Sequence, residues 1–271
     1  MRDLIKQQIA NCISDFRLLG GARTVWRTPL IGYAAASDPL FDRLKTLVSP
    51  SHLAPRELLP GAETVIVTFL PFDERVVESN QEPGPASREW AIAYIETNRL
   101  LETINAQLVQ SLEQNGYAAV ALPPTHNFDE EQLISDWSHK HVAYIAGLGT
   151  FGLHHMLITA AGCAGRLGSL VTNAYLEPTP RPDWEACLYK AHGNDPRACS
   201  ACVQRCPVDA LSVDLARPFD RHACYQVCLE NARRYADEGR ADVCGKCVSV
   251  VPCSFVDPVA QTQHSKRDSS L

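Results

Sequence analysis

Nine of the eleven cysteines of this sequence fall between Cys187 and Cys253, which is the clustering of a metal-binding array. Two runs carry the spacing: Cys199-x2-Cys202-x3-Cys206-Pro207 and Cys244-x2-Cys247-x5-Cys253. A Cys-x2-Cys turn presents two thiolates to one iron–sulfur cluster, and a cysteine followed by proline commonly ligates the other cluster of a pair. The array therefore predicts two [4Fe-4S] clusters.

Eight cysteines are expected to act as ligands in the crossed arrangement of two-cluster ferredoxins. One cluster is assigned to Cys187, Cys199, Cys202 and Cys253, and the other to Cys206, Cys224, Cys244 and Cys247. Cys187 is included because Pro196 stands where the bacterial C-x2-C-x2-C-x3-C-P run has its first cysteine. Cys228 remains an alternative to Cys224 or Cys187.

Structural zinc is the competing interpretation, since two Cys-x2-Cys turns also build a four-thiolate zinc site. Zinc would use four cysteines, leave five clustered ones unexplained and give Pro207 no role. The remaining cysteines, Cys12 and Cys163, lie outside the array and are interpreted as ordinary buried thiols.

The composition is that of a globular protein without a membrane span. The chain has 271 residues, 45% of them hydrophobic, and a formal net charge of -6, which gives no overall attraction to nucleic acid or anionic lipid. No run of about 18 apolar residues is present, and the amphipathic start contains Asp3 and Asp15, unlike a secretory leader. We therefore expect a cytoplasmic protein, in which the cysteines would not form structural disulfides.

Hydrophobic periodicity predicts helices and strands that alternate before the cysteine-rich segment. Helices are expected at 3–19, 40–48, 87–115 and 130–145, strands at 64–70, 117–122 and 168–172, and a polar loop at 74–86. This pattern indicates an α/β domain of the α+β layered kind over residues 1–181. A ferredoxin-like domain with the two clusters is expected at 182–258, and a disordered tail at 259–271.

Several segments are similar to epoxyqueuosine reductases and their relatives. The cysteine part resembles that family in CLYKAHGNDPRACSACVQRCPVDAL, RHACYQVC and VCGKCVSVVPC. The upstream part resembles it in LLPGAETVIVTFLPF, AGLGTFGLHHMLIT and GRLGSLVTN. The resemblance implies a nitroreductase-like domain that binds cobalamin, coupled to two four-iron clusters, in a superfamily shared with reductive dehalogenases. In that family electrons pass through the clusters to cobalt, whose low-valent state drives a two-electron reduction.

The resemblance also implies a corrinoid site on a glycine-rich face. Its residues would be Gly147, Gly149, Thr150, Phe151, Gly152, Leu153, Ser169, Leu170 and Thr172. Glycines allow the backbone to approach a large planar ligand and to expose N–H groups to it. Judged from the residues alone, the same run is also consistent with a simple turn after a helix.

Three departures from the family bear on the substrate. The Asp-Thr-Gly-Pro stretch that carries the proposed proton donor of epoxyqueuosine reductases is absent, and Asp136 is not in its register. The chain ends at Leu271, so it reads as a short form without the C-terminal helical-repeat domain of that family. The acidic charge balance offers no evident RNA surface. Transfer RNA is therefore not expected as a partner, and a small-molecule substrate is.

Candidate catalytic residues lie just before the glycine-rich turn. Asp136 and Tyr144 are eight residues apart and would share a helix face, and His139 titrates in a range that suits a proton donor. A solvated stripe and a surface histidine are the competing interpretations. His154 and His155 follow the turn and could reach a cofactor, while Arg166 could pair with a propionamide, phosphate or carboxylate.

These observations lead to one principal hypothesis and two alternatives. The principal one is an iron–sulfur oxidoreductase that passes electrons through two clusters to a cobalamin-type cofactor. A low-potential donor such as a ferredoxin or flavodoxin would supply these electrons. The first alternative is an electron-transfer or corrinoid-handling protein that reduces no substrate itself. The second is a zinc-stabilised interaction module.

Overall fold

A four-stranded antiparallel sheet with the strand order β1-β2-β6-β3 forms the centre of the molecule. The computed structural model describes residues 1–124 and 128–262. The strands are β1 (Leu30–Ala35), β2 (Thr64–Pro71), β3 (Ala119–Leu122) and β6 (Gly165–Thr172). β2 and β6 pair along their whole length, from Thr64 opposite Thr172 to Pro71 opposite Gly165. Together with the helices, this sheet confirms the mixed α/β class predicted from the sequence.

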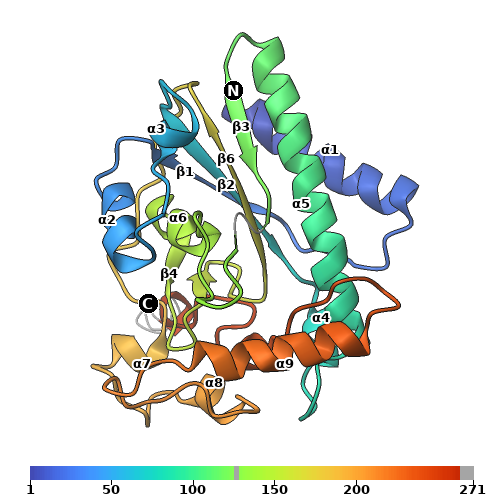
Figure 1. Ribbon diagram of the computed structural model, residues 1–271, viewed down its shortest axis with the longest axis vertical. Coiled ribbons are helices and arrows are strands. Elements are labelled where there is room, and N and C mark those ends of the chain that lie inside the picture. The colour runs from blue at the N-terminus through green and yellow to red at the C-terminus, as the bar shows by residue number, and fades with distance from the viewer. Residues whose placement is uncertain (125–127, 263–271) are drawn as a thin grey trace, which may run out of the picture.

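Helices cover both faces of this sheet (Figure 1). They are α1 (Arg2–Gly20) and α5 (Arg88–Gln114) on one side, and α2 (Leu40–Leu47) and α6 (His139–Ile145) on the other. Two further short helices are α3 (Pro55–Leu58) and α4 (Glu74–Ser79). The predicted caps of α5 are present: Ser87 accepts a hydrogen bond from the Trp90 N–H, and Gly116 follows the helix at a φ of 83°.

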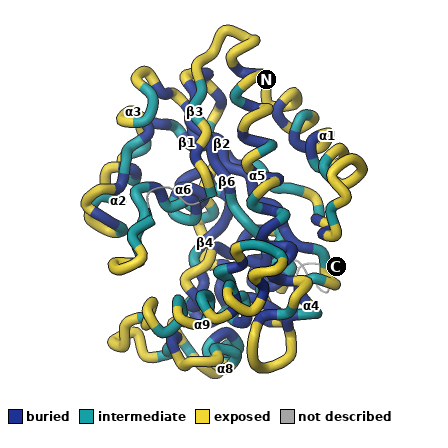
Figure 2. Tube along the Cα trace, turned by 45° about the vertical axis from the view of Figure 1, so that its right-hand side comes forward, coloured by how far each residue is buried: buried dark blue, intermediate teal, exposed yellow. Residues whose placement is uncertain are grey.

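The apolar run of β2 is explained by burial on both sides. Every residue of the strand is buried, and Figure 2 shows β2 and β6 as a dark core between exposed helix surfaces. Ile66 and Leu70 belong to the hydrophobic cluster under α1 and α5, while Val67 and Phe69 belong to the cluster under α2 and α6. A strand buried on both faces needs no polar alternation, which is why its sequence is nearly all apolar.

The helix predicted at 130–145 is wrong in its first half, because α6 begins only at His139. Residues 128–138 form turns instead. The Asp129 carboxylate accepts hydrogen bonds from the N–H groups of Glu131 and Gln132, but the Asp129 N–H donates to the Ile134 carbonyl at 2.8 Å, which closes a turn where the helix would have to continue. Leu133 has a φ of 55°, a left-handed conformation that an α-helix cannot contain.

Several short elements were not predicted. The loop expected at 74–86 starts as α4, whose N-cap Asp73 accepts a hydrogen bond from the Arg75 N–H. β1 was missed because its sequence lacks a clear alternation of polar and apolar residues. β4 (Gly149–Phe151) and β5 (Leu157–Thr159) form a hairpin with three residues in each strand, which is too short for a periodicity to show.

The cysteine-rich segment lies at one end of the sheet (Figure 1). Its elements are α7 (Leu188–Ala191), α8 (Ala201–Gln204), α9 (Arg221–Arg234) and the 3-10 helix η1 (Lys246–Val248). The hydrophobic core runs into it without a break, since Cys202, Leu211 and Val248 belong to the same buried cluster as Ile66 and Leu108. The two predicted units, 1–181 and 182–258, thus share one core.

The last described residues are helical around Pro258 to Thr262, where the Gln261 N–H donates to the Asp257 carbonyl. The rest of the tail predicted to be disordered, 263–271, lies outside the described residues. Within the described part of the chain, no helix combines the length and apolar character needed to cross a lipid bilayer.

Candidate metal centre and adjoining cleft

Four predicted ligands converge on one small cavity and are called the first thiol set. They are Cys187, Cys199, Cys202 and Cys253, around a cavity of about 20 Å³. Cys187 precedes α7 and Cys202 lies on α8, so two short helices position them. Burial raises the pKa of the Cys202 thiol to about 12, helped by the charges of Cys253 and Cys187. Four deprotonated sulfurs in this place would repel each other, so they could be thiolates together only with a positive charge, such as a metal, among them.

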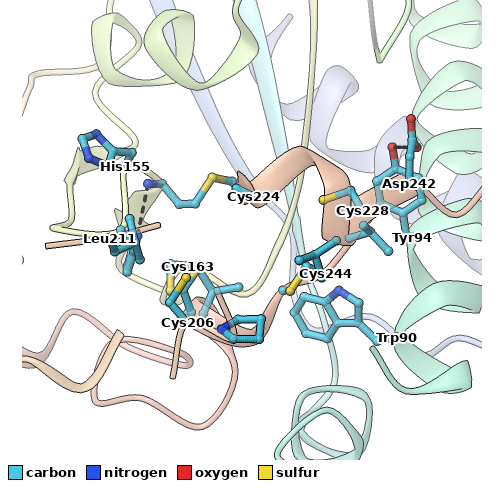
Figure 3. A pocket seen from close by; sticks show the side chains of 18 of the residues that line it. Trp90, Tyr94, His155, Cys163, Cys206, Leu211, Cys224, Cys228, Asp242 and Cys244 are labelled. Atoms are coloured by element: carbon cyan, nitrogen blue, oxygen red, sulfur yellow. Dashed lines mark hydrogen bonds between the residues drawn. The ribbon is translucent and has the colours of Figure 1, made fainter. Parts of the chain in front are cut away.

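The other four predicted ligands form the second thiol set. Cys206, Cys224, Cys244 and Cys247 line a larger cavity of about 240 Å³, together with Cys163 and Cys228 (Figure 3). Burial raises the pKa of Cys244 and of Cys247. Cys224 differs, because a hydrogen bond with Cys228 and the positive charge of Lys140 lower its pKa to about 7. Cys228 is therefore a close neighbour of Cys224, the predicted ligand to which it is an alternative.

Backbone N–H groups point at the sulfurs of both sets. The Ala210 N–H donates to Cys206 Sγ at 3.2 Å. Backbone hydrogen bonds also reach Cys199 and Cys202, from Ala201 and Val203. Such bonds stabilise thiolate charge and are a regular feature of iron–sulfur sites.

The loop of η1 is fixed by a buried polar network. Lys246 is 3% exposed, and its ammonium donates to the Asn80 carbonyl, the Asn80 side chain and the Glu82 carbonyl. The Asn80 amide in turn donates to the Cys244 carbonyl at 3.0 Å. This network positions the Cys244-x2-Cys247 turn against the end of α4.

Cys163 was predicted to be an ordinary buried thiol, but it lies beside a predicted ligand. Its Sγ is 3.8 Å from Cys253 Sγ, and the donor atoms of Cys163, Cys253 and His154 lie within 4.8 Å of one another. The hydrogen bonds from Cys163 and His154 lower the pKa of Cys253 to about 5. Spacing could not have revealed this neighbour, because ninety residues separate the two cysteines. Cys12, by contrast, is buried on α1, as expected.

A cleft of about 360 Å³ adjoins the second thiol set. The cleft and the thiol cavity share Lys140, Met156, Cys163, Gly165 and Arg166 as lining residues. The Arg166 guanidinium is held by its Nε–H, which donates to the Asn98 side chain at 2.8 Å, and by stacking 4.2 Å above the Tyr94 ring. Within the described residues, no acid forms an ion pair with Arg166.

The ammonium of Lys140 faces the same cleft, and its Nζ donates to the His155 carbonyl. Burial and the neighbouring Arg221 lower the pKa of Lys140. No carboxylate of the described residues lines this cleft. Lys140, Arg166 and Arg221, which all line the cleft, therefore favour a ligand that carries negative charge or carbonyl oxygens.

The nine residues of the predicted corrinoid face do not share one cavity. Gly147, Gly149 and Thr150 line a separate cavity of about 540 Å³, and Phe151, Gly152 and Leu153 line another of about 370 Å³. Ser169, Leu170 and Thr172 are buried in β6. A Cβ on Gly149 would lie 2.0 Å from the Ile158 carbonyl oxygen, so close backbone packing already requires this glycine.

The predicted catalytic residues also lie apart. The Asp136 carboxylate accepts a hydrogen bond from the Ser51 hydroxyl, next to α2. His139 lines the cleft, but its ring nitrogens are 2.9 Å from Ser169 Oγ and 2.8 Å from the Pro123 carbonyl oxygen. Tyr144 packs against Phe151, with ring centroids 5.9 Å apart. These contacts are structural, and only His139 reaches the cleft.

Comparison with known proteins gives similarity at the level of structure. No protein-family model and no curated protein matches the sequence. The Bacillus subtilis epoxyqueuosine reductase has 17% sequence identity and a TM-score of 0.54, over 91% of this chain and 65% of that one. An epoxyqueuosine reductase solved with a modified tRNA-Tyr stem loop has 17% identity and a TM-score of 0.53, over 91% and 65%.

A catabolic reductive dehalogenase in complex with 3-bromo-4-hydroxybenzoic acid is similar in the same way. It has 15% identity and a TM-score of 0.55, over 86% of this chain and 31% of that one. The chain thus spans less than two thirds of the length of these proteins. Identities this low establish the fold alone, and at that level the predicted resemblance to epoxyqueuosine reductases and reductive dehalogenases is confirmed.

Proposed function

We propose, from the fold shared with epoxyqueuosine reductases and a reductive dehalogenase, that this protein is a reductase with two [4Fe-4S] clusters and a cobalamin-type cofactor. One observation carries the proposal: the eight predicted ligands of the 187–253 segment line two cavities, four of them around the smaller one and the other four, together with Cys163 and Cys228, around the larger one. Four thiolates are the ligand set of one four-iron cluster.

The chemistry of each set fits this assignment. The cysteines are buried or partly buried, and backbone N–H groups donate to Cys199, Cys202 and Cys206. At the second set, the indole Nε1 of Trp90, a residue that lines the cavity, is buried and has no hydrogen-bond partner among the described residues. The cavity of the second set, about 240 Å³, is far larger than a single zinc ion needs, whereas the sulfurs of the first set surround about 20 Å³.

We place the cofactor in the cleft beside the second thiol set. When bound, the clusters would carry single electrons and a corrinoid would supply a low-valent cobalt for two-electron reduction. Arg166 and Lys140 would orient the polar edge of the cofactor and neutralise its negative charge. The apolar wall of the cleft, which includes Phe69 and Leu167, would exclude water from it. Electrons from an external low-potential donor would enter at the first thiol set.

The alternative of an electron-transfer or corrinoid-handling protein has one observation in its favour. The candidate catalytic residue Asp136 bonds Ser51, the candidate proton donor His139 bonds Ser169 and the Pro123 carbonyl, and no carboxylate of the described residues lines the cleft. A cofactor held there would have few acids nearby to supply a proton to a substrate.

Metal analysis of anaerobically purified protein tests the proposal. We expect a brown protein with about eight iron and eight sulfide per chain, four of each for every cluster, and cluster signals in EPR spectra after reduction. Cobalamin titration, followed by absorbance, should then saturate at one equivalent. A colourless protein with stoichiometric zinc would identify the zinc module. A protein with both clusters that does not bind cobalamin would support the alternative of an electron-transfer protein.

A substitution at Arg166 locates the cofactor. Arg166→Met is expected to weaken cobalamin binding about tenfold, which corresponds to about 1.4 kcal/mol, because a fixed cation leaves the cleft. The matched control is Arg181→Met, which removes an arginine that lines the glycine-rich cavity and pairs with Asp38. Cobalamin titration of both variants decides between the cleft and the glycine-rich cavity. If only Arg181→Met bound cobalamin more weakly, the cofactor site would be the glycine-rich cavity.

A further inference from the structure

We propose that each thiol set receives one side-chain N–H donor from outside the cysteine-rich segment: His154 for the first set and Trp90 for the second. Both are positioning residues that stabilise negative charge on sulfur. The inference rests on the proposed function, because the sulfur charge in question is that of an iron–sulfur cluster.

The tautomer of His154 is fixed by its surroundings. The ring is 4% exposed, and the Met156 backbone N–H donates to its Nδ1 at 3.1 Å. A neutral imidazole whose Nδ1 accepts a hydrogen bond carries its proton on Nε2. Nε2 lies 3.4 Å from Cys253 Sγ, so the ring donates to this predicted ligand.

Glycine at position 152 makes this arrangement possible. A Cβ there would lie 2.6 Å from the His154 ring, so any side chain would push the imidazole away from its place beside Cys253. The glycine-rich turn thus has a second role besides backbone packing, because Gly152 leaves space for the His154 imidazole that donates to the first thiol set.

Trp90 stands in the corresponding position at the second set. The side chain is 3% exposed, and its ring is fixed by Phe72 at a centroid distance of 5.1 Å, edge to face. A Cβ on Gly245 would lie 2.4 Å from the indole Nε1, so this nitrogen rests directly against the Cys244-x2-Cys247 turn. Figure 3 shows the indole beside Cys244 at the edge of the thiol cavity.

Within the described part of the chain, the buried indole N–H of Trp90 has no hydrogen-bond acceptor. A buried N–H without a hydrogen bond costs about 1–3 kcal/mol, and native proteins rarely leave one so. An indole nitrogen can only donate, so its partner must be an acceptor. The acceptors that a cluster would bring to this cavity are its sulfide and thiolate sulfurs.

Hydrogen bonds to sulfur favour the reduced cluster, which carries the additional negative charge, and so raise its reduction potential. Removal of either donor should therefore make one potential more negative and leave the other unchanged. The two donors serve different sets, so the effects of the two substitutions are separable.

Redox titration of the anaerobic holoprotein, followed by EPR, tests the inference. Trp90→Phe keeps an aromatic ring and removes the N–H, and we expect it to lower one potential. His154→Leu should lower the other, and His154→Gln, which restores an N–H, should recover part of that shift. The control is Trp26→Phe, since the Trp26 indole donates to Thr97 on α5 instead, and neither potential should move. Iron content is measured on every variant.

The same measurements distinguish failure of the donor inference from failure of the proposed clusters. If Trp90→Phe and His154→Leu keep full iron and wild-type potentials, the donor inference is wrong while the clusters stand. It is equally wrong if both substitutions shift the same potential, or if Trp26→Phe shifts one as strongly. Wild-type protein without iron would instead refute the proposed function itself.

Discussion

Replacing Cys202 with serine is expected to lower the iron content of the anaerobically purified protein from about eight to about four atoms per chain. Cys202 is 6% exposed and contributes one of the four sulfurs of the first thiol set. Serine is a poor ligand for a four-iron cluster, and the other three thiolates do not complete its set of four ligands. Iron and sulfide assays measure the loss, and the remaining EPR signal belongs to the second set.

The matched control is Cys12→Ser, which makes the same chemical change at another buried cysteine. Cys12 is 2% exposed on α1 and belongs to the same hydrophobic cluster as Cys202. This variant should keep all of its iron, although burial of a hydroxyl will reduce its stability. Equal iron in the two variants would contradict the ligand assignment, and equal loss in both would indicate general unfolding.

Gly162→Ala is expected to reduce the free energy of unfolding by at least about 3 kcal/mol, as measured by chemical denaturation. Gly162 has a φ of 83°, and a Cβ there would lie 2.3 Å from the Ser254 carbonyl oxygen. The obstacle is backbone, so it cannot move aside as a flexible side chain does. The next residue, Cys163, donates its N–H to the Cys253 carbonyl at 2.9 Å. The same substitution should therefore also lower the iron content of the first thiol set.

Gly61→Ala separates backbone strain from collision. Gly61 has a similar φ of 77°, but a Cβ there would meet nothing within 4 Å. We expect a cost of about 1 kcal/mol, the ordinary penalty for a left-handed alanine, and no loss of iron. If the two alanine variants were equally stable, the contact between Gly162 and the Cys253–Ser254 segment would have no energetic role.

The long elements of the fold could be predicted because their local signals agree with their environment. α5 combines an apolar stripe with a serine cap and a terminal glycine, and β2 is apolar because both of its faces are buried. The segment 130–138 could not be predicted, since its helical pattern is overridden by turns around Asp129 and a left-handed Leu133. The β4–β5 hairpin is too short for any periodicity to identify it.

The spacing of the cysteines, a local property of the sequence, predicts two groups of four ligands, and each group lines one cavity, the second together with Cys163 and Cys228. Their neighbours could not be predicted, since Cys163, His154 and Trp90 reach the sulfurs only through the tertiary fold. The glycine-rich turn shows the limit of motif reasoning. Its glycines are needed because Ile158 and His154 pack closely against them. Close packing and ligand binding both produce a glycine-rich run, so the sequence cannot distinguish them.

The shared core gives the proposed clusters an influence beyond electron transfer. Cys187 and Cys202 are packed in the same buried cluster as the sheet and α5, so the thiol sets and the body of the protein fold together. Metal that binds only the native state adds its binding energy to the stability of the whole chain. A cell short of iron would then hold less of this protein, through degradation of unfolded chains, and not merely an inactive pool of it.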